Sequence, residues 1–205
     1  MKKYSAFIFT FGLVLTILIS NVCASIRDGR KLDELRGSVL RLHILADSDS
    51  EMDQWLKMKV RDELLRKSDY IFSDADSLEE AEKNAGEKLD LIEQISESVL
   101  RRYGCKDKVK AEITNVDFDE RVYGDITMPA GNYKALRVSI GSAQGHNWWC
   151  VMYPPLCIPA VCGIEDDKET EEEFFDEEEL DIMYHPKKYQ VRFAVWDKIK
   201  SWLDF

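Results

Sequence analysis

The sequence predicts an α+β domain with a mostly antiparallel sheet of about four to five strands and two longer helices packed on one face. Apolar and polar residues alternate over residues 38–46, which is typical of a half-buried strand. Helical spacing follows over residues 50–103, and alternation returns over residues 108–153. Strands and helices that are segregated along the chain in this way indicate the α+β class.

The first strand is predicted from Leu42 and Ile44, which alternate with Arg41 and His43. Because successive side chains of a strand point to opposite faces, the two apolar residues share one face and the two basic residues share the other. The apolar face is therefore expected to meet the helices.

Two serines mark the starts of the predicted helices. Ser50 precedes Asp53 by three residues, and Ser77 precedes Glu80 by three, which is the spacing of a capping side chain. Apolar residues at helical spacing follow each serine. The second helix is predicted to stop at Gly104, since glycine tolerates the left-handed conformation that ends many helices.

Three further strands are predicted over residues 108–118, 133–140 and 147–153. The first two form an antiparallel pair with a long, turn-rich connection. The third ends at Pro154 and Pro155, because proline cannot donate a hydrogen bond within a central ladder.

The C-terminal part of the sequence contains an acidic run and one more predicted strand. Residues 165–181 hold twelve acidic residues and one lysine, which predicts a solvated loop with a short helix at its end. Past Pro186, Val191, Phe193 and Val195 alternate with other residues, so a strand followed by a short amphipathic helix is expected.

The N-terminal segment predicts export. A short cationic start and an apolar run over residues 1–24 are typical of a signal peptide or an N-terminal anchor. Residues 25–205 are then expected to form a single domain. Loss of the segment would remove Lys2 and Lys3 and change the formal net charge from −11 to −13.

This negative charge bears on the class of partner. Nucleic acids and anionic lipid surfaces are bound through lysine and arginine, and both are expected to repel the protein as a whole. A protein partner is therefore favoured, with membrane contact only through the N-terminal segment if it is not cleaved.

Four cysteines remain if Cys23 leaves with the signal: Cys105, Cys150, Cys157 and Cys162. In an exported protein they permit two disulfides, in any of three pairings. A Cys150–Cys157 bond that closes the loop containing the two prolines is the favoured pairing.

Enzymatic and metal sites find less support in the sequence. A thiol hydrolase that pairs Cys150 with His43 or His146 is the main catalytic alternative, but no cysteine-protease signature surrounds Cys150. The spacing typical of zinc sites is absent from the sequence, as is a phosphate-binding loop. No cofactor, catalytic residue or small-molecule substrate is therefore predicted.

The adjacent tryptophans Trp148 and Trp149 have two interpretations. Both rings can belong to the core, one on each face of the sheet, or one can be exposed in a docking patch with Tyr153, Pro154 and Pro155. On the second interpretation, the loop after the first strand also contributes to partner binding. The predicted partner-binding residues are then Trp148, Trp149, Tyr153, Pro154, Pro155, His43, Asp47, Ser48 and Asp49.

Three stretches together resemble the stage II sporulation protein R family of endospore-forming bacteria. They are LRLHILADSDSEMDQWLKMKVRDELL from Leu40, YGDITMPAGNYKALRVSIGSAQGHNWWCVMYPPLC from Tyr123, and YQVRFAVWDKIKSW near the end. The resemblance implies a signalling protein secreted into the space between the forespore and mother-cell membranes. It also implies that the protein activates a membrane-bound aspartic-type protease of the mother cell, which then processes the pro-form of sigma E.

The resemblance extends to individual positions. The matching residues are Leu42, His43, Ser48, Asp49, Lys59, Arg61, Asp62, Tyr123, Gly124, Pro129, Gly131, Tyr133, Leu136, Asn147, Trp148, Trp149, Cys150, Pro154, Pro155, Leu156 and Cys157. The chain departs from the family pattern at Asp119 and Glu120, where a proline and a threonine are usual.

Overall fold

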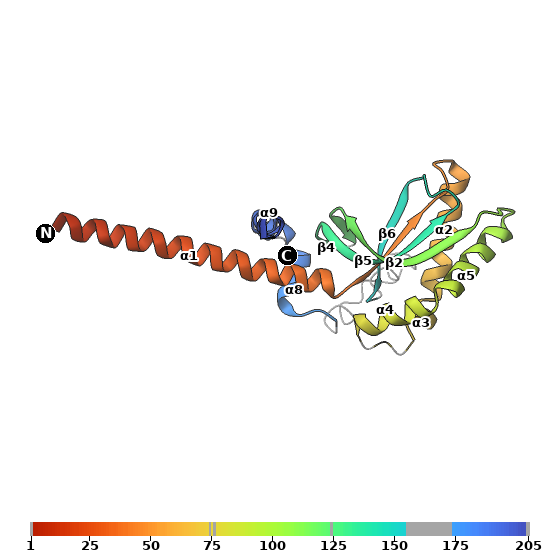
Figure 1. Ribbon diagram of the computed structural model, residues 1–205, viewed down its shortest axis with the longest axis horizontal. Helices are drawn as coiled ribbons and strands as arrows, with labels where there is room; N and C mark the ends of the chain where they lie inside the picture. The colour runs from red at the N-terminus through yellow and green to blue at the C-terminus, as the bar shows by residue number, and fades with distance from the viewer. Residues whose placement is uncertain (1, 74, 76, 124, 155–173, 204–205) are drawn as a thin grey trace.

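The computed structural model describes residues 2–73, 75, 77–123, 125–154 and 174–203 (Figure 1). A long N-terminal helix projects from a mixed body of strands and helices. The elements in chain order are α1 (Lys2–Gly37), β1 (Leu40–Leu45), α2 (Glu51–Arg66), α3 (Ser68–Ile71), α4 (Leu78–Glu87), α5 (Leu89–Arg102), β2 (Val109–Phe118), β3 (Arg121–Tyr123), β4 (Ile126–Met128), β5 (Gly131–Ile140), β6 (Asn147–Tyr153), α8 (Glu177–Tyr184) and α9 (Pro186–Leu203).

The sheet confirms the predicted α+β class. Its strand order is β2-β5-β1-β6, and β3 and β4 form a separate two-stranded hairpin. β5 is antiparallel to β2 and parallel to β1, while β6 is antiparallel to β1. The parallel pair arises because a crossover that includes α2 to α5 separates β1 from β5 in the chain.

One face of the sheet is covered by helices α2, α4 and α5, as the sequence predicts (Figure 1). Leu42 and Ile44 of β1 and Leu136 and Val138 of β5 are fully buried on this helix-covered face. Ser50 and Ser77 cap α2 and α4 by accepting hydrogen bonds from the backbone N–H groups three residues later. The predicted second helix is divided at Lys88 into α4 and α5.

The opposite face carries Arg41 and His43, and the β3–β4 hairpin lies against it. This hairpin forms within the segment predicted to be a turn-rich connection, with Tyr123 paired with Ile126. We call this side of the sheet the hairpin face.

Helix α1 has two halves with different surroundings. Its apolar side chains from Ile8 to Val22 are exposed by 45% to 76%. The helix is long and apolar enough to cross a membrane, with a mean hydropathy of 2.0 over its most apolar window. Leu32 and Leu35 in the second half are fully buried. The helix is continuous across residue 24, so the predicted boundary of the signal or anchor lies within it.

The C-terminal segment is helix α9 and not the predicted strand, so the assignment of Val191, Phe193 and Val195 to a strand is wrong. Pro186 occupies the first position of the helix, where its fixed φ is favourable. Tyr189 and Phe193 are buried four residues apart, which is helical spacing.

Polar contacts attach α9 to the second half of α1. Trp196 Nε1 and Lys200 Nζ donate to Asp33 at 3.0 and 3.1 Å, and Arg36 forms an ion pair of 3.0 Å with Asp197. These bonds join segments that are more than 160 residues apart in the chain.

The acidic run contains the predicted short helix at its end. Asp176 caps α8 by accepting hydrogen bonds from the backbone of Glu178 and Glu179, and Lys31 of α1 pairs with Asp176 at 2.7 Å. The rest of the predicted loop, residues 165–173, lies outside the described residues.

Replacing Gly29 by alanine is expected to loosen α9. The added Cβ would overlap the ring of Trp196, so the helices must separate or the ring must move, at about 1 to 3 kcal/mol of stability. Hydrogen exchange of α9 in the detergent-solubilised full chain measures the effect. As the control, Gly86→Ala in α4 meets no atom within 4 Å and is expected to stabilise the chain by up to about 1 kcal/mol. Equal protection of α9 in both variants would contradict the prediction.

Candidate functional site

The paired tryptophans lie on opposite faces of the sheet. In the ladder between β1 and β6, Trp148 is opposite Ile44 and Trp149 is opposite His43. Trp148 therefore lies on the helix-covered face, and Trp149 on the hairpin face. Both side chains are half-buried. The two rings define two neighbourhoods, one at the end of the sheet and one on the hairpin face.

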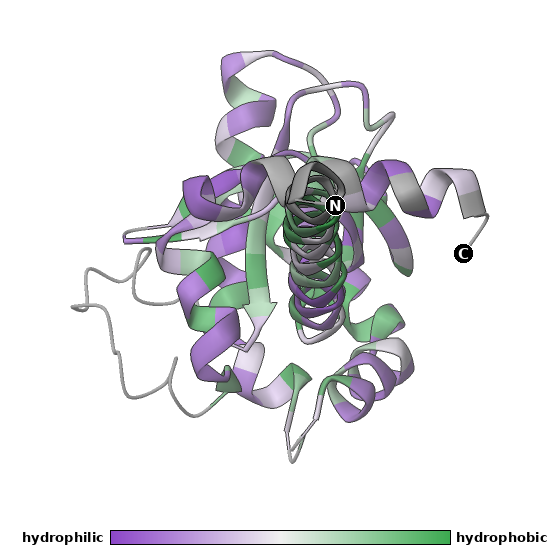
Figure 2. Cartoon of the chain, turned by 90° about the vertical axis from the view of Figure 1, so that its left-hand side faces the viewer, coloured by the Kyte–Doolittle hydropathy of each residue, from purple (hydrophilic) through white to green (hydrophobic). Residues whose placement is uncertain are grey.

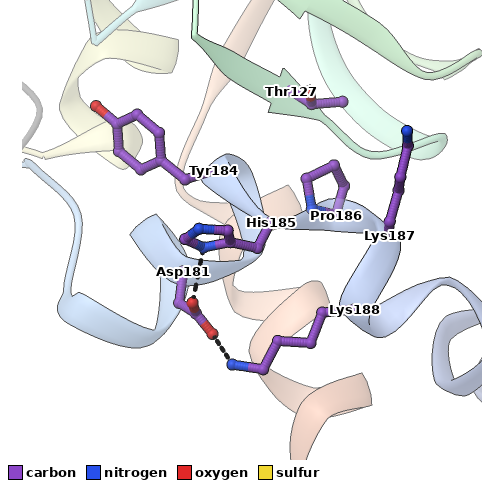
Figure 3. Close-up of a pocket in the computed structure, with 7 residues that line it drawn as sticks. All are labelled: Thr127, Asp181, Tyr184, His185, Pro186, Lys187 and Lys188. Atoms are coloured by element: carbon purple, nitrogen blue, oxygen red, sulfur yellow. Dashed lines mark hydrogen bonds and ion pairs between the residues drawn. The ribbon is translucent and has the colours of Figure 1, made fainter.

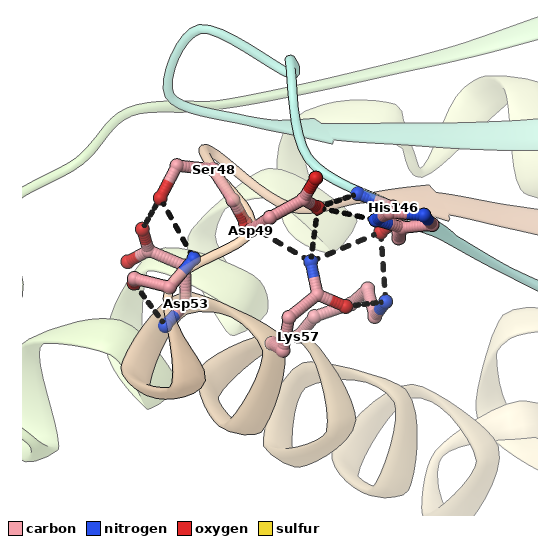
Figure 4. A network of polar contacts seen from close by, with 7 residues as sticks. Ser48, Asp49, Asp53, Lys57 and His146 are labelled. Atoms are coloured by element: carbon pink, nitrogen blue, oxygen red, sulfur yellow. Dashed lines mark hydrogen bonds and ion pairs between the residues drawn. The ribbon is translucent and has the colours of Figure 1, made fainter.

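The first neighbourhood is a polar network between the loop after β1 and the loop before β6 (Figure 4). Asp49 Oδ1 accepts a hydrogen bond from the backbone N–H of His146 at 2.6 Å and lies 2.6 Å from the ring Nδ1. Lys57 donates to the carbonyl oxygen of His146 at 2.7 Å and to Gln54 at 2.5 Å. We call the two loops, residues 46–50 and 141–146, the loop rim.

A second set of bonds holds the rim at Asp47. Its carboxylate accepts from the backbone N–H of Ser142 at 2.5 Å, and its carbonyl oxygen accepts from the Ser142 hydroxyl at 2.9 Å. A Cβ at Gly141 or Gly145 would overlap Asp47 or Ser48, so the close approach of the loops requires glycine.

Hydrogen bonds within the rim favour the charged form of two carboxylates, those of Asp47 and Asp49. The backbone N–H of Ser142 lowers the pKa of Asp47, and the backbone N–H of His146 lowers that of Asp49, because both hydrogen bonds favour the carboxylate. The side chains of His146 and Asp49 remain 81% and 56% exposed. The predicted residues Asp47, Ser48 and Asp49 thus meet at one fixed and accessible edge.

Trp148 adjoins this edge. The guanidinium carbon of Arg61 in α2 lies 4.5 Å from its ring centroid, a cation–π arrangement. Lys57 is 4% exposed. Lys57 is not among the predicted site residues, because the local pattern shows only a lysine among apolar residues at helical spacing.

The second neighbourhood is a cluster around buried Arg41 on the hairpin face. The guanidinium carbon lies 4.0 Å from the ring centroid of Phe118 and 4.9 Å from that of Tyr133, and Nη2 donates to the Tyr123 hydroxyl at 2.7 Å. Trp149 contacts Phe118 at 5.0 Å between ring centroids. We call these residues, together with His43, the aromatic cluster.

The aromatic cluster holds hydrogen-bonding groups without partners. Within the described part of the chain, Nε and Nη1 of Arg41 and both ring nitrogens of His43 have none. Burial, and then the charges of Arg137 and Arg41, lower the pKa of His43 to about 4. His43 is therefore neutral near pH 7 and cannot bind an anion through charge there.

Tyr153 and Pro154 do not form the predicted exposed patch. Tyr153 is 7% exposed, and its hydroxyl donates to the carbonyl oxygen of Ala75 at 3.1 Å. Pro154 is also buried, and Pro155 lies outside the described residues. Packing of the Tyr153 ring against Phe72 explains the difference from the prediction, because it directs the ring inward.

The structure places two of the four cysteines that were predicted as disulfide partners. Cys105 has a free thiol, which donates to Asp107 at 3.1 Å, so it is not a disulfide partner in this structure. Cys150 is 1% exposed on the helix-covered face, and Cys157 and Cys162 lie outside the described residues.

Cys150 does not lie next to His43 or His146, as the predicted thiol hydrolase would require. His43 lies on the face opposite Cys150, and His146 lies in the exposed rim. Cys150 is buried and disulfide-bonded, so it offers no free thiolate that could act as a nucleophile.

A hollow of about 650 Å³ lies where α8 meets α9, beside Thr127 of β4 (Figure 3). Asp181 in its wall pairs with Lys188 at 2.6 Å and His185 at 3.0 Å. Hydrogen bonding from Lys188 and then from Tyr189 lowers the pKa of Asp181 to about 2. A carboxylate held in this way is a weak base, so the arrangement serves to join the two helices.

Comparisons with known proteins identify the family. Residues 36–162 match the family model for stage II sporulation protein R. The stage II sporulation protein R of Bacillus subtilis (strain 168) is 35% identical over 133 residues, which cover 65% of this chain and 59% of that protein. The chain thus spans less than two thirds of the length of this relative. No solved structure matches.

The low pKa of His43 gives a measurable pH dependence. Its ring resonance is expected to titrate near pH 4, and not near 6.5, in a nuclear magnetic resonance titration of the full chain. Because the unfolded imidazole binds a proton below about pH 6.5 and the folded one does not, unfolding free energy should fall by about 3 kcal/mol between pH 6.5 and 4. His43→Phe should lose this part of the slope. A titration midpoint near 6.5 would show that the ring is solvated.

Proposed function

Since the chain belongs to the stage II sporulation protein R family, we propose that it is an exported signal that activates a membrane-bound aspartic-type protease of the mother cell. The activated protease removes the pro-sequence of the sporulation factor sigma E. The observation that carries the proposal is the family match over residues 36–162, which contains the loop rim and the aromatic cluster.

The proposed location is the space between the forespore and mother-cell membranes. Helix α1 supports export because its first half is apolar and exposed, as in a signal peptide or an anchor. Retained in the forespore membrane, it would hold the body in the intermembrane space, facing the protease.

The position of the loop rim supports its use as the contact surface. β1 begins shortly after α1 and ends at the rim. Its six residues span about 20 Å, and this length separates the rim from the end of α1. An anchored protein would thereby present Asp49 and His146 away from its own membrane. Trp148 beside the rim supplies the large, half-exposed ring that is common in binding hot spots.

Activation requires a preference for one state of the protease. A signal that bound the active and inactive forms equally would not shift their populations. Fixed hydrogen bonds such as Asp47–Ser142 keep the rim in one shape, so little ordering free energy is lost on binding.

Replacing Trp148 by alanine is expected to reduce sigma factor processing strongly. Truncation of a hot-spot tryptophan costs about 2 kcal/mol or more, which is about thirtyfold in affinity. His146→Ala tests the same edge with little effect on folding, because that side chain is 81% exposed. Processing is measured by reconstituting the purified full chain with the protease and its substrate in vesicles.

Tyr70→Ala is the matched control, since this aromatic residue is 62% exposed in α3, beyond the C-terminal end of α2, and its loss should leave processing unchanged. Normal processing by folded Trp148→Ala and His146→Ala proteins would exclude the rim as the contact surface.

We also expect Cys150 to pair with Cys157 in the exported protein. A buried cysteine in the middle of β6 and a second cysteine seven positions later can close a short loop. Peptide mass mapping without and with reduction, after the free thiols are alkylated, identifies the bond. A Cys150–Cys162 peptide, or alkylated Cys150, would contradict this pairing.

A further inference from the structure

Helix α9 differs in charge from the rest of the protein. It contains five lysine or arginine residues and one aspartate, whereas the whole chain has a net charge of −11. Lys187 and Lys198 are exposed and make no ion pair within the described part of the chain. Trp202 near the end of α9 is 85% exposed, more than the other large exposed apolar side chains of the described residues.

The orientation of α9 is also distinctive. Figure 1 shows α9 end-on beside α1, and Figure 2, which looks along α1, shows α9 crossing it sideways. The two helices are therefore nearly perpendicular. If α1 crosses a bilayer, α9 must lie parallel to the plane of that bilayer.

The level at which α9 crosses α1 fits the bilayer surface. The contacts with α9 lie at Gly29, Asp33 and Arg36, while the exposed apolar run of α1 ends at Val22. Seven residues of helix separate Val22 from Gly29, a rise of about 10 Å. Lipid headgroups and the long side chains of lysine and tryptophan fill a gap of this size.

We propose that α9 is an interfacial helix that lies on the headgroup layer of the membrane that α1 enters. Trp202 inserts at the boundary between headgroups and acyl chains, where amphipathic indole rings are favoured. Lys187 and Lys198 bind lipid phosphates. The net negative charge does not prevent this contact, because charges more than about 10 Å from the surface are screened by salt.

The inner face of α9 fixes this geometry. Tyr189 and Phe193 are buried, and Trp196 packs its ring on Gly29 while donating to Asp33. These contacts hold α9 against α1 and leave Lys198 exposed, so its long side chain can reach the headgroup layer while α9 stays attached to α1. This proposal does not depend on the identity of the protease.

The test uses the full chain reconstituted in vesicles of phosphatidylcholine and phosphatidylglycerol, with and without brominated acyl chains that quench tryptophan fluorescence. No tryptophan lies in the apolar run of α1, so quenching reports on the body alone. Trp202→Phe is expected to remove most of the quenched signal. Trp55→Phe, which removes a ring that is 42% exposed on α2, is the control and should leave the quenched signal intact.

The charge contribution is tested with Lys187→Glu combined with Lys198→Glu. Each lysine near an anionic surface contributes about fivefold to binding, so this variant should expose Trp202 to aqueous quenchers. Lys83→Glu with Lys106→Glu makes the same charge change at exposed positions of the body and should have no effect.

Equal quenching of the wild-type and Trp202→Phe proteins by brominated lipid would overturn the proposal. So would loss of sigma factor processing in the Trp202→Phe protein while quenching by lipid is absent from the wild type, because α9 would then bind a protein. Failure of the rim variants described above has no bearing on these outcomes.

Discussion

The pairing of β1 on both of its edges is the constraint on which the structure depends. β1 pairs with β5 on one side and β6 on the other, so its residues can only alternate between the two faces of the sheet. Leu42 and Ile44 must then enter the core below the helices, while Arg41 and His43 must enter the hairpin face. The same ladder directs Trp148 and Trp149 apart.

β1 also connects the parts to which a role is assigned. It begins beside α1 and ends in the loop rim, while the aromatic cluster is built on its middle residues. Arg41 is fully buried, and two of its donor groups have no partner among the described residues; each such group costs about 1 to 3 kcal/mol. The rings of Phe118 and Tyr133 offset part of this cost through cation–π contact with the guanidinium. An apolar residue at this position would be easier to bury, so stability alone does not explain the arginine.

Local patterns were sufficient to predict much of this fold. The alternation around Leu42 and the capping spacing at Ser50 each depend on neighbouring residues only, and they correctly predict the strand β1 and the start of α2. The expectation that this strand is half-buried is wrong, because Arg41 and His43 on its other face are buried as well. Helix α9 is not predicted, because Val191, Phe193 and Val195 alternate over a short stretch. Such a stretch is compatible with a strand or a helix, and only the contact with α1 favours the helix. The inward turn of Tyr153 and the burial of Lys57 result from contacts with distant segments, Ala75 and His146, which no local spacing reveals.

The unbroken course of α1 affects when the segment could be removed. A peptidase that cuts near Ala24 must bind extended backbone, yet this position lies in the middle of a 36-residue helix whose second half is attached to α8 and α9. Once Lys31 and Asp33 have docked, unwinding the scissile region also strains those attachments. Cleavage before docking would therefore release a diffusible body, and docking before cleavage would leave a tethered one.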